Sequence, residues 1–392
     1  MGKPKTKKKQ AWASYIGVVF FLFIGFLCGI CIGKLIYLPD AEDLPLGQYL
    51  LQMAFMIIWM YLAILLHLII HEAGHLVFGL LTGYKFSSFR IFSIMWLKED
   101  DKIVCKRLSL AGTGGQCLLL PPDMKDGKIP YVLYNLGGSL ANILASILFL
   151  GLYYACGSHT VLSTMMMICV IVGVVLAMMN GIPMRMGTVD NDGYNAFSIG
   201  KNPDAMRAFW LQMKINELQS KGIRLKDMED AWFLCPADDA MQNSMVAAVA
   251  VFSCNRLVDA HRFAEADMQM LHLLSLDKSG IIGLHRNLML CDRMYIELIT
   301  ENRREIIDSI RTKELQKFMK SMKNFISILR TEYAYALLCE KDTEKAAHLK
   351  EQFEKTAKTY PYQSDIQSEW ELITIAEQAA AALPSAPLTM TT

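Results

Sequence analysis

The chain has 392 residues, of which 53% are hydrophobic and 20% charged, and its formal net charge at pH 7 is +1. The hydrophobic share is high and the charged share is low for a wholly soluble protein. The small net charge gives no general attraction to polyanions, so we expect no nucleic-acid partner. Nearly all long apolar runs lie before residue 184, which predicts a membrane half followed by a soluble half.

Four uncharged runs in the first half are long enough to cross a bilayer. The hydrocarbon core is roughly 30 Å thick and needs a helix of about 20 residues. Residues 1–10 form a basic tail with five lysines, which is typical of a cytoplasmic topology signal. The predicted transmembrane helices extend these runs where needed, past Lys34 in the first and through Glu72 in the second, and cover residues 11–38, 48–84, 129–156 and 160–183.

The basic residues between the predicted helices indicate their orientation. The connector 85–128 holds eight lysines and arginines, whereas the loop 39–48 holds none. Because basic loops stay in the cytoplasm, the N-terminus, this connector and everything after residue 184 are predicted to be cytoplasmic. The chain would then be a multi-pass membrane protein with both termini in the cytoplasm.

Residues 85–127 are rich in aromatic and β-branched side chains and contain a glycine-rich stretch. This pattern predicts two or three short strands, forming a small β-hairpin region on the cytoplasmic side. Residues 194–380 read as soluble amphipathic helices in tetratricopeptide-like pairs, and residues 381–392 as a disordered tail. The predicted fold class is membrane α-helical, with four transmembrane helices, the hairpin region and a soluble all-α domain.

One motif in the sequence has the spacing of a metal-binding site. His71, Glu72 and His75 form the spacing H-E-x-x-H inside the second predicted span. Residues four apart lie on one face of a helix, so both imidazoles can reach one metal ion. Zinc lowers the pKa of a bound water from about 15.7 toward 7, and the Glu72 carboxylate can then take its proton. An ionisable side chain in an apolar span costs free energy unless it has a partner, so such groups usually have a function. The motif therefore predicts a catalytic zinc site.

A third protein ligand is expected for such a zinc site. The apolar spans offer no further acid, but the fourth span is followed at its cytoplasmic end by Asp190 and Asp192. Asn180 and Pro183 would end the fourth helix there and free backbone groups near the site. From position alone, either aspartate could complete the set.

Three motifs in chain order resemble those of the site-2 protease family of intramembrane zinc metalloproteases. They are the His71–His75 segment, then Gly138-Ser-Leu-Ala-Asn142, then Asn180-x-x-Pro183 with Asp192-Gly193 after it. The resemblance covers roughly residues 50–193. Residues 11–193 would accordingly form a membrane-embedded metalloprotease domain, and residues 194–380 a cytoplasmic helical domain.

The resemblance implies a role for each matched residue. His71, His75 and Asp192 would hold one Zn²⁺ per chain, and Glu72 would be the general base. Asn142 would lie near the scissile carbonyl and steady the oxyanion. The remaining matched residues, which would contact the substrate, are Gly138, Asn180 and Pro183.

The chain departs from the family pattern in three ways. The gap from Pro183 to Asp192 is longer than usual, only one glycine follows the aspartate, and Ser139 stands where proline is common. The long gap keeps Asp190 open as an alternative third ligand.

The implied activity is hydrolysis of a peptide bond in or near the transmembrane segment of a membrane protein. The substrate would be a single-span protein or peptide in the lipid bilayer, and the family suggests a bacterial cytoplasmic membrane. An edge strand within Ser88–Trp96 or Leu108–Leu119 would hold the unwound substrate. The helical domain would recognise a protein partner.

Two other functions fit parts of the sequence. A prenyl-peptide type of H-E-x-x-H protease would need a glutamate ligand with an aspartate four residues on, but Glu265 and Asp267 are only two apart. A catalytically inactive scaffold could bind a membrane protein and use its helical cytoplasmic domain. An intact Glu72 argues against the scaffold, because binding alone does not need a base.

Overall fold

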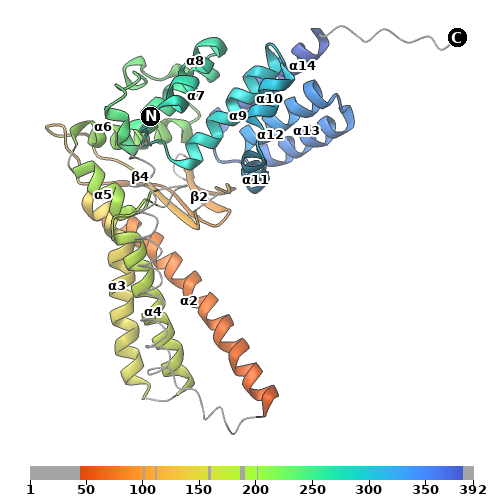
Figure 1. The fold of residues 1–392 in the computed structure, drawn as a ribbon. Coiled ribbons are helices and arrows are strands. Elements are labelled where there is room, and N and C mark those ends of the chain that lie inside the picture. The colour runs from red at the N-terminus through yellow and green to blue at the C-terminus, as the bar shows by residue number, and fades with distance from the viewer. Residues whose placement is uncertain are drawn as a thin grey trace, which may run out of the picture. The chain divides into compact units, whose positions relative to one another are not determined.

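The computed structural model describes six segments of the chain: residues 45–99, 102–110, 113–157, 160–185, 190–200 and 202–382. The predicted basic tail, the first predicted span and residues 383–392 lie outside them. The described residues form thirteen α-helices and one small antiparallel sheet, so the predicted helical class is confirmed (Figure 1). The chain divides into two compact units. Among described residues, the first holds 45–74 and 136–182, and the second holds 75–135 and 183–382.

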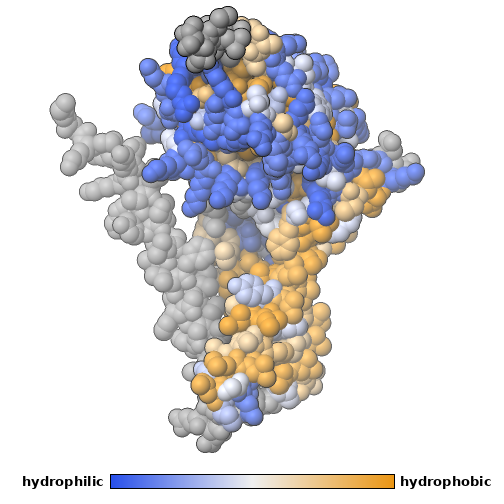
Figure 2. All heavy atoms as spheres, turned by 90° about the vertical axis from the view of Figure 1, so that its right-hand side faces the viewer, coloured by the Kyte–Doolittle hydropathy of each residue, from blue (hydrophilic) through white to orange (hydrophobic). Residues whose placement is uncertain are grey.

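The first unit is built from helices α2 (Leu46–Leu81), α3 (Val132–Ala155) and α4 (Val161–Gly181). All three are long and apolar enough to cross a membrane. Their ends lie within three residues of the predicted second, third and fourth spans. The most apolar windows of α2, α3 and α4 are only 11%, 28% and 39% buried, so most of their apolar side chains face outward. Figure 2 shows this apolar surface in orange.

Small residues let the helices of the first unit approach closely. A Cβ atom added at Gly74 of α2 would lie 2.4 Å from the carbonyl oxygen of Gly137 on α3. At the start of α4, the Thr160 hydroxyl accepts from the Ser163 N–H and the Ser163 hydroxyl accepts from the Thr160 N–H, a reciprocal N-terminal cap.

The sheet has four strands, β1 (Lys85–Ile91), β2 (Ile94–Glu99), β3 (Lys102–Arg107) and β4 (Gly115–Leu120). They pair antiparallel in the order β3-β2-β1-β4. The prediction of two or three strands was therefore one strand short. Strand β4 begins inside the glycine-rich stretch, and the candidate segment Leu108–Leu119 includes all of it except Leu120. The segment Ser88–Trp96 is not one strand either, because it contains the β1–β2 turn.

The rest of the second unit is helical. Helix α5 covers Asp192–Gly200, and nine more helices follow it in chain order. These are α6 (Pro203–Ser220), α7 (Ser244–Asp259), α8 (Phe263–Ser275), α9 (Gly283–Ile299), α10 (Arg304–Ile310), α11 (Lys313–Ser321), α12 (Ile326–Ala334), α13 (Thr343–Ala357) and α14 (Gln363–Ala382).

The helical part has an apolar core but no established tetratricopeptide repeat. Ala266 and Phe353 are fully buried in one core cluster. Between these two positions, however, the helices have seven to seventeen residues, and a π-helical segment (Tyr335–Glu340) follows α12 directly. Helix α14 continues to Ala382, so the predicted boundary of the disordered tail at 381 falls inside a helix.

Candidate metal centre

His75 and Asp192 face each other in the second unit. The Nε2 atom of His75 lies 3.3 Å from Oδ2 of Asp192, the first residue of α5. The other ring nitrogen, Nδ1, lies 2.7 Å from the carbonyl oxygen of Tyr134. Because a carbonyl oxygen only accepts, Nδ1 is the donor in this contact, and Nε2, which faces Asp192, is the nitrogen left for a metal ion. A carbonyl partner of this kind commonly orients a metal-binding histidine.

Asn191 fixes the segment that presents Asp192. Its side-chain oxygen accepts hydrogen bonds from the backbone N–H groups of Met184 and Tyr194, at 3.0 and 2.9 Å. This oxygen therefore ties the start of the connection after α4 to the first turn of α5. Asp192 then lies in the first turn of a helix, where the helix dipole favours a negative charge.

His71 is held within the first unit. It precedes His75 by one turn of the unbroken helix α2, and its ring lies against α3. A Cβ atom added at Gly138 would lie 2.5 Å from the ring carbon Cε1 of His71, so only glycine leaves room for the imidazole. The side-chain nitrogen of Asn142 lies 3.4 Å from Nδ1 of His71.

The residues present fit a metal ion. The ligand atoms of His71, His75 and Asp192 all lie within 4.8 Å of one another. Zinc binds nitrogen and oxygen at about 2.0–2.2 Å, so two ligands of one tetrahedral ion lie about 3.4 Å apart. The 3.3 Å separation of the His75 and Asp192 atoms matches that spacing. Two imidazoles and one carboxylate also leave a fourth position for water or substrate.

The structure favours Asp192 over Asp190 as the third ligand. The carboxylate of Asp190 pairs with Arg185, with Oδ1 lying 3.4 Å from Nε, and the two residues form an isolated β-bridge. Asp190 is not part of the cluster that could hold a metal ion.

Other predicted site residues lie outside the ligand cluster. Glu72 is buried on α2 between the two histidines. Asn142 is fully buried on α3, and its side-chain oxygen lies 3.1 Å from Nδ1 of His67. Asn180 lies in the last turn of α4, where its side-chain nitrogen donates to the Leu176 carbonyl, and Pro183 is exposed beyond that helix.

Two neighbours of the site have no counterpart in the sequence motifs. Tyr134 acts through its backbone carbonyl, while its hydroxyl donates to the carbonyl of Cys117 in β4. His67 lies in the helix bundle, one turn before His71, and its ring packs edge-on against Phe149. In the sequence, the spacing of four residues between His67 and His71 indicates that both lie on the same face of α2.

Comparison with protein-family models, with curated proteins and with solved structures finds no match to this chain. The geometry of the described residues therefore carries the functional argument. It provides a cluster of His71, His75 and Asp192 that could bind a metal ion, and the described residues include three helices long and apolar enough to cross a membrane.

Proposed function

We propose that the protein is an intramembrane zinc metalloprotease that resembles the site-2 protease family. The observation that carries this proposal is the convergence of His71, His75 and Asp192 within 4.8 Å. Two of these residues lie on a helix long and apolar enough to cross a membrane. A metal site in such a helix suits a substrate that is itself a membrane segment.

In the proposed site, His71, His75 and Asp192 hold one zinc ion. When bound, zinc would act as a Lewis acid and lower the pKa of a water molecule toward 7. The His75–Tyr134 hydrogen bond keeps the imidazole in the tautomer that can ligate through Nε2. Asn191 keeps the Asp192 carboxylate aimed at the same point.

Glu72 is proposed as the general base. Its carboxylate takes a proton from the attacking water and delivers it to the leaving amine of the cleaved peptide bond. The residue is 6% exposed, so its carboxylate is largely shielded from bulk water. Asn142 contacts His71 and His67, so we propose that it positions the His71 ring. This role is additional to the one expected of Asn142 near the scissile carbonyl.

The substrate is proposed to pair with an edge of the sheet. Strand β4 pairs with β1 on one side and is the last strand in the sheet order. The Tyr134 hydroxyl bonds to Cys117 of β4 while the Tyr134 carbonyl bonds to His75. A peptide added to this edge would be extended, with its scissile bond accessible. The candidate strand Leu108–Leu119 includes most of β4.

The test compares wild-type protein with Glu72→Gln after purification in detergent. Both should contain about one zinc per chain, and only the wild type should cleave single-span test substrates. Absence of zinc from the wild type would refute the proposal. Zinc without cleavage of any substrate would support the inactive scaffold instead.

A second pair of variants tests the ligand set. Asp192→Asn should lose zinc, whereas Asp190→Asn should retain it, because Asp190 already pairs with Arg185. Loss of zinc from both variants to the same extent would contradict the proposed assignment.

A further inference from the structure

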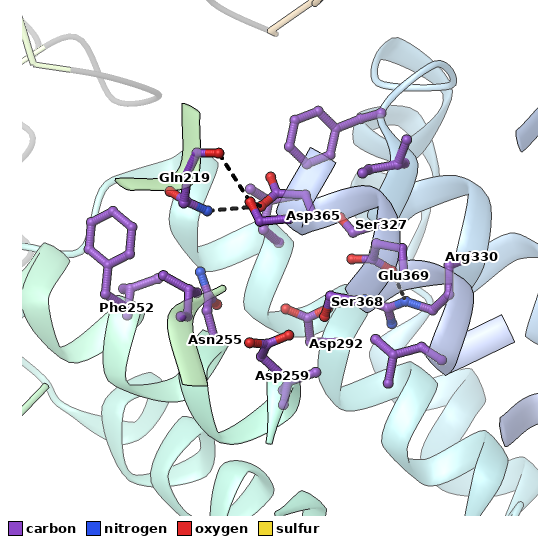
Figure 3. Close-up of a pocket in the computed structure, with 18 of the residues that line it drawn as sticks. Gln219, Phe252, Asn255, Asp259, Asp292, Ser327, Arg330, Asp365, Ser368 and Glu369 are labelled. Carbon is purple, nitrogen blue, oxygen red and sulfur yellow. Dashed lines mark hydrogen bonds and ion pairs between the residues drawn. The ribbon is translucent and has the colours of Figure 1, made fainter. Parts of the chain in front are cut away.

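A second candidate site lies within the helical part of the second unit. A cavity of about 280 Å³ is bounded mainly by helices α7, α9, α12 and α14. Figure 3 shows acidic and polar side chains from these helices turned toward one another across it. None of these residues belongs to the candidate metal centre, so the cavity needs its own explanation.

One part of the cavity wall is apolar. Aliphatic and aromatic side chains on α7, α9 and α14, and before α12, line it. An extended hydrocarbon chain of a few carbons would be shielded from water there. The side chains concerned are Val251, Phe252, Val258, Leu284, Leu288, Phe325 and Leu372.

The other part of the wall is acidic, and most of its charge is already paired. Arg330 bonds to Glu369 at 2.8 Å and to Asp292 at 2.6 Å. Arg224 bonds to Asp259 at 2.7 Å and also reaches Glu371 outside the cavity lining. The two arginines of the lining are thus engaged by carboxylates.

Asp365 is the carboxylate of the lining for which the described residues provide no cationic partner. It accepts hydrogen bonds from the Gln219 amide at 2.9 Å and from the Ser364 hydroxyl at 3.4 Å, but forms no ion pair. Burial, followed by the negative charge of Glu369, raises the pKa of Asp365 to about 7. The cavity therefore contains an acid whose charged form lacks a counter-ion.

Two further groups point to a ligand. Arg330 is 1% exposed, and its Nη1 atom has no hydrogen-bond partner among the described residues. The Arg330 residue itself forms part of the cavity lining. His285 also lines the cavity, and burial lowers the pKa of its imidazole to about 4, so it stays neutral and does not balance Asp365.

We propose that this cavity binds a primary ammonium group carried on a short aliphatic chain, with Asp365 as its counter-ion. The apolar wall would cover the hydrocarbon chain, and the ammonium would supply the cationic partner that Asp365 lacks among the described residues. A lysine side chain of a protein and a free diamine share this chemistry. The test below distinguishes these two sources.

The test is calorimetric titration of the full-length protein in detergent at pH 7.5. The probes are Nα-acetyl-lysine amide, its Nε-acetylated form, which has no charge, and 1,5-diaminopentane, which has no carbonyl. The charged probes should bind, and the Nε-acetylated probe should bind at least roughly tenfold more weakly. Tighter binding of the lysine amide identifies a peptide source, and tighter binding of the diamine identifies a free amine.

The variant Asp365→Asn should weaken binding of the charged probes by roughly tenfold to a hundredfold. Asp277→Asn, at an exposed position outside the cavity, is the matched control and should bind like the wild type. No binding of either charged probe to the wild type would overturn the proposal, as would equal affinities for the charged and Nε-acetylated forms. Glu72→Gln should bind these probes normally, which separates this result from the test of proteolysis.

Discussion

His75 Nδ1 and the Tyr134 carbonyl oxygen are 2.7 Å apart, and this contact determines which nitrogen of His75 can bind a metal. The same tyrosine bonds through its hydroxyl to Cys117, so one residue connects the motif helix with strand β4. The orientation of the histidine thus depends on a residue outside the H-E-x-x-H motif.

Gly138→Ala should weaken zinc binding by about tenfold to a hundredfold, the range typical for changes to groups that orient ligands. The new methyl group would lie 2.5 Å from Cε1 of His71, so the imidazole would have to move. The measurement is competition for zinc with a chromogenic chelator. Gly151→Ala on the same helix is the control, because its Cβ would meet nothing within 4 Å. Equal zinc affinity in the two variants would contradict the packing argument.

Asn191→Ala should lower both stability and zinc affinity. Removing the side-chain oxygen leaves two N–H groups without their acceptor, which costs about 1 kcal/mol. Asp192 is then less firmly positioned, and we expect about tenfold weaker zinc binding. Asn202→Ala removes a similar cap from α6 and should reduce stability alone. If it reduces zinc affinity equally, the effect of Asn191 is a general loss of stability.

Arg330→Leu should destabilise the helical part by about 3–5 kcal/mol, because Asp292 and Glu369 would lose their shared cation. The guanidinium also lies 4.2 Å from the centre of the Tyr295 ring, a cation–π contact that the leucine would lack. Denaturant unfolding followed by circular dichroism measures the change. Arg262→Leu breaks the exposed pair with Glu265, which solvent screens, and should leave stability nearly unchanged.

Asp365→Asn should change how stability depends on pH. The pKa of Asp365 is raised in the folded protein to about 7, above its ordinary value of 3.8, so its contribution to stability is lost as pH rises from about 4 through 7. Asparagine does not ionise, so the variant should gain on the order of 1–3 kcal/mol relative to the wild type at pH 8 and little at pH 4.

The neighbours of Asp365 do not reverse this expectation. Glu369 and Asp259 raise its pKa further, while burial raises the pKa values of Tyr360 and Tyr362, so both phenols stay neutral below pH 8. Unfolding curves measured from pH 4 to 8 test the difference between the proteins. A constant difference across that range would rule out Asp365 as its source.

The sequence was sufficient to place the two histidines and Glu72 on one helix, because a spacing of four residues defines a helical face. It also narrowed the third ligand to two aspartates. Choosing between them needed the contact of Asp190 with Arg185 and the cap formed by Asn191, which depend on a loop conformation. The Tyr134 carbonyl was beyond prediction, because any residue has a backbone carbonyl.

The helices were predictable where apolar runs are long, and less so elsewhere. Strand β4 is six residues long and starts with glycine, so its pairing with β1 is set by tertiary contacts rather than by local propensity. The cavity around Asp365 combines Gln219, Arg330 and residues of α14, which are far apart in the chain. No local pattern in the sequence indicates that they meet.

The 36-residue length of α2 has a consequence for water supply. At 1.5 Å per residue, His71 lies about 38 Å along the helix from Leu46, beyond the roughly 30 Å thickness of a hydrocarbon core. If α2 crosses the bilayer upright from its first turn, the motif arrives at the depth of the lipid headgroups. The proposed hydrolysis would then draw its water directly from the interface, without a long channel through the protein.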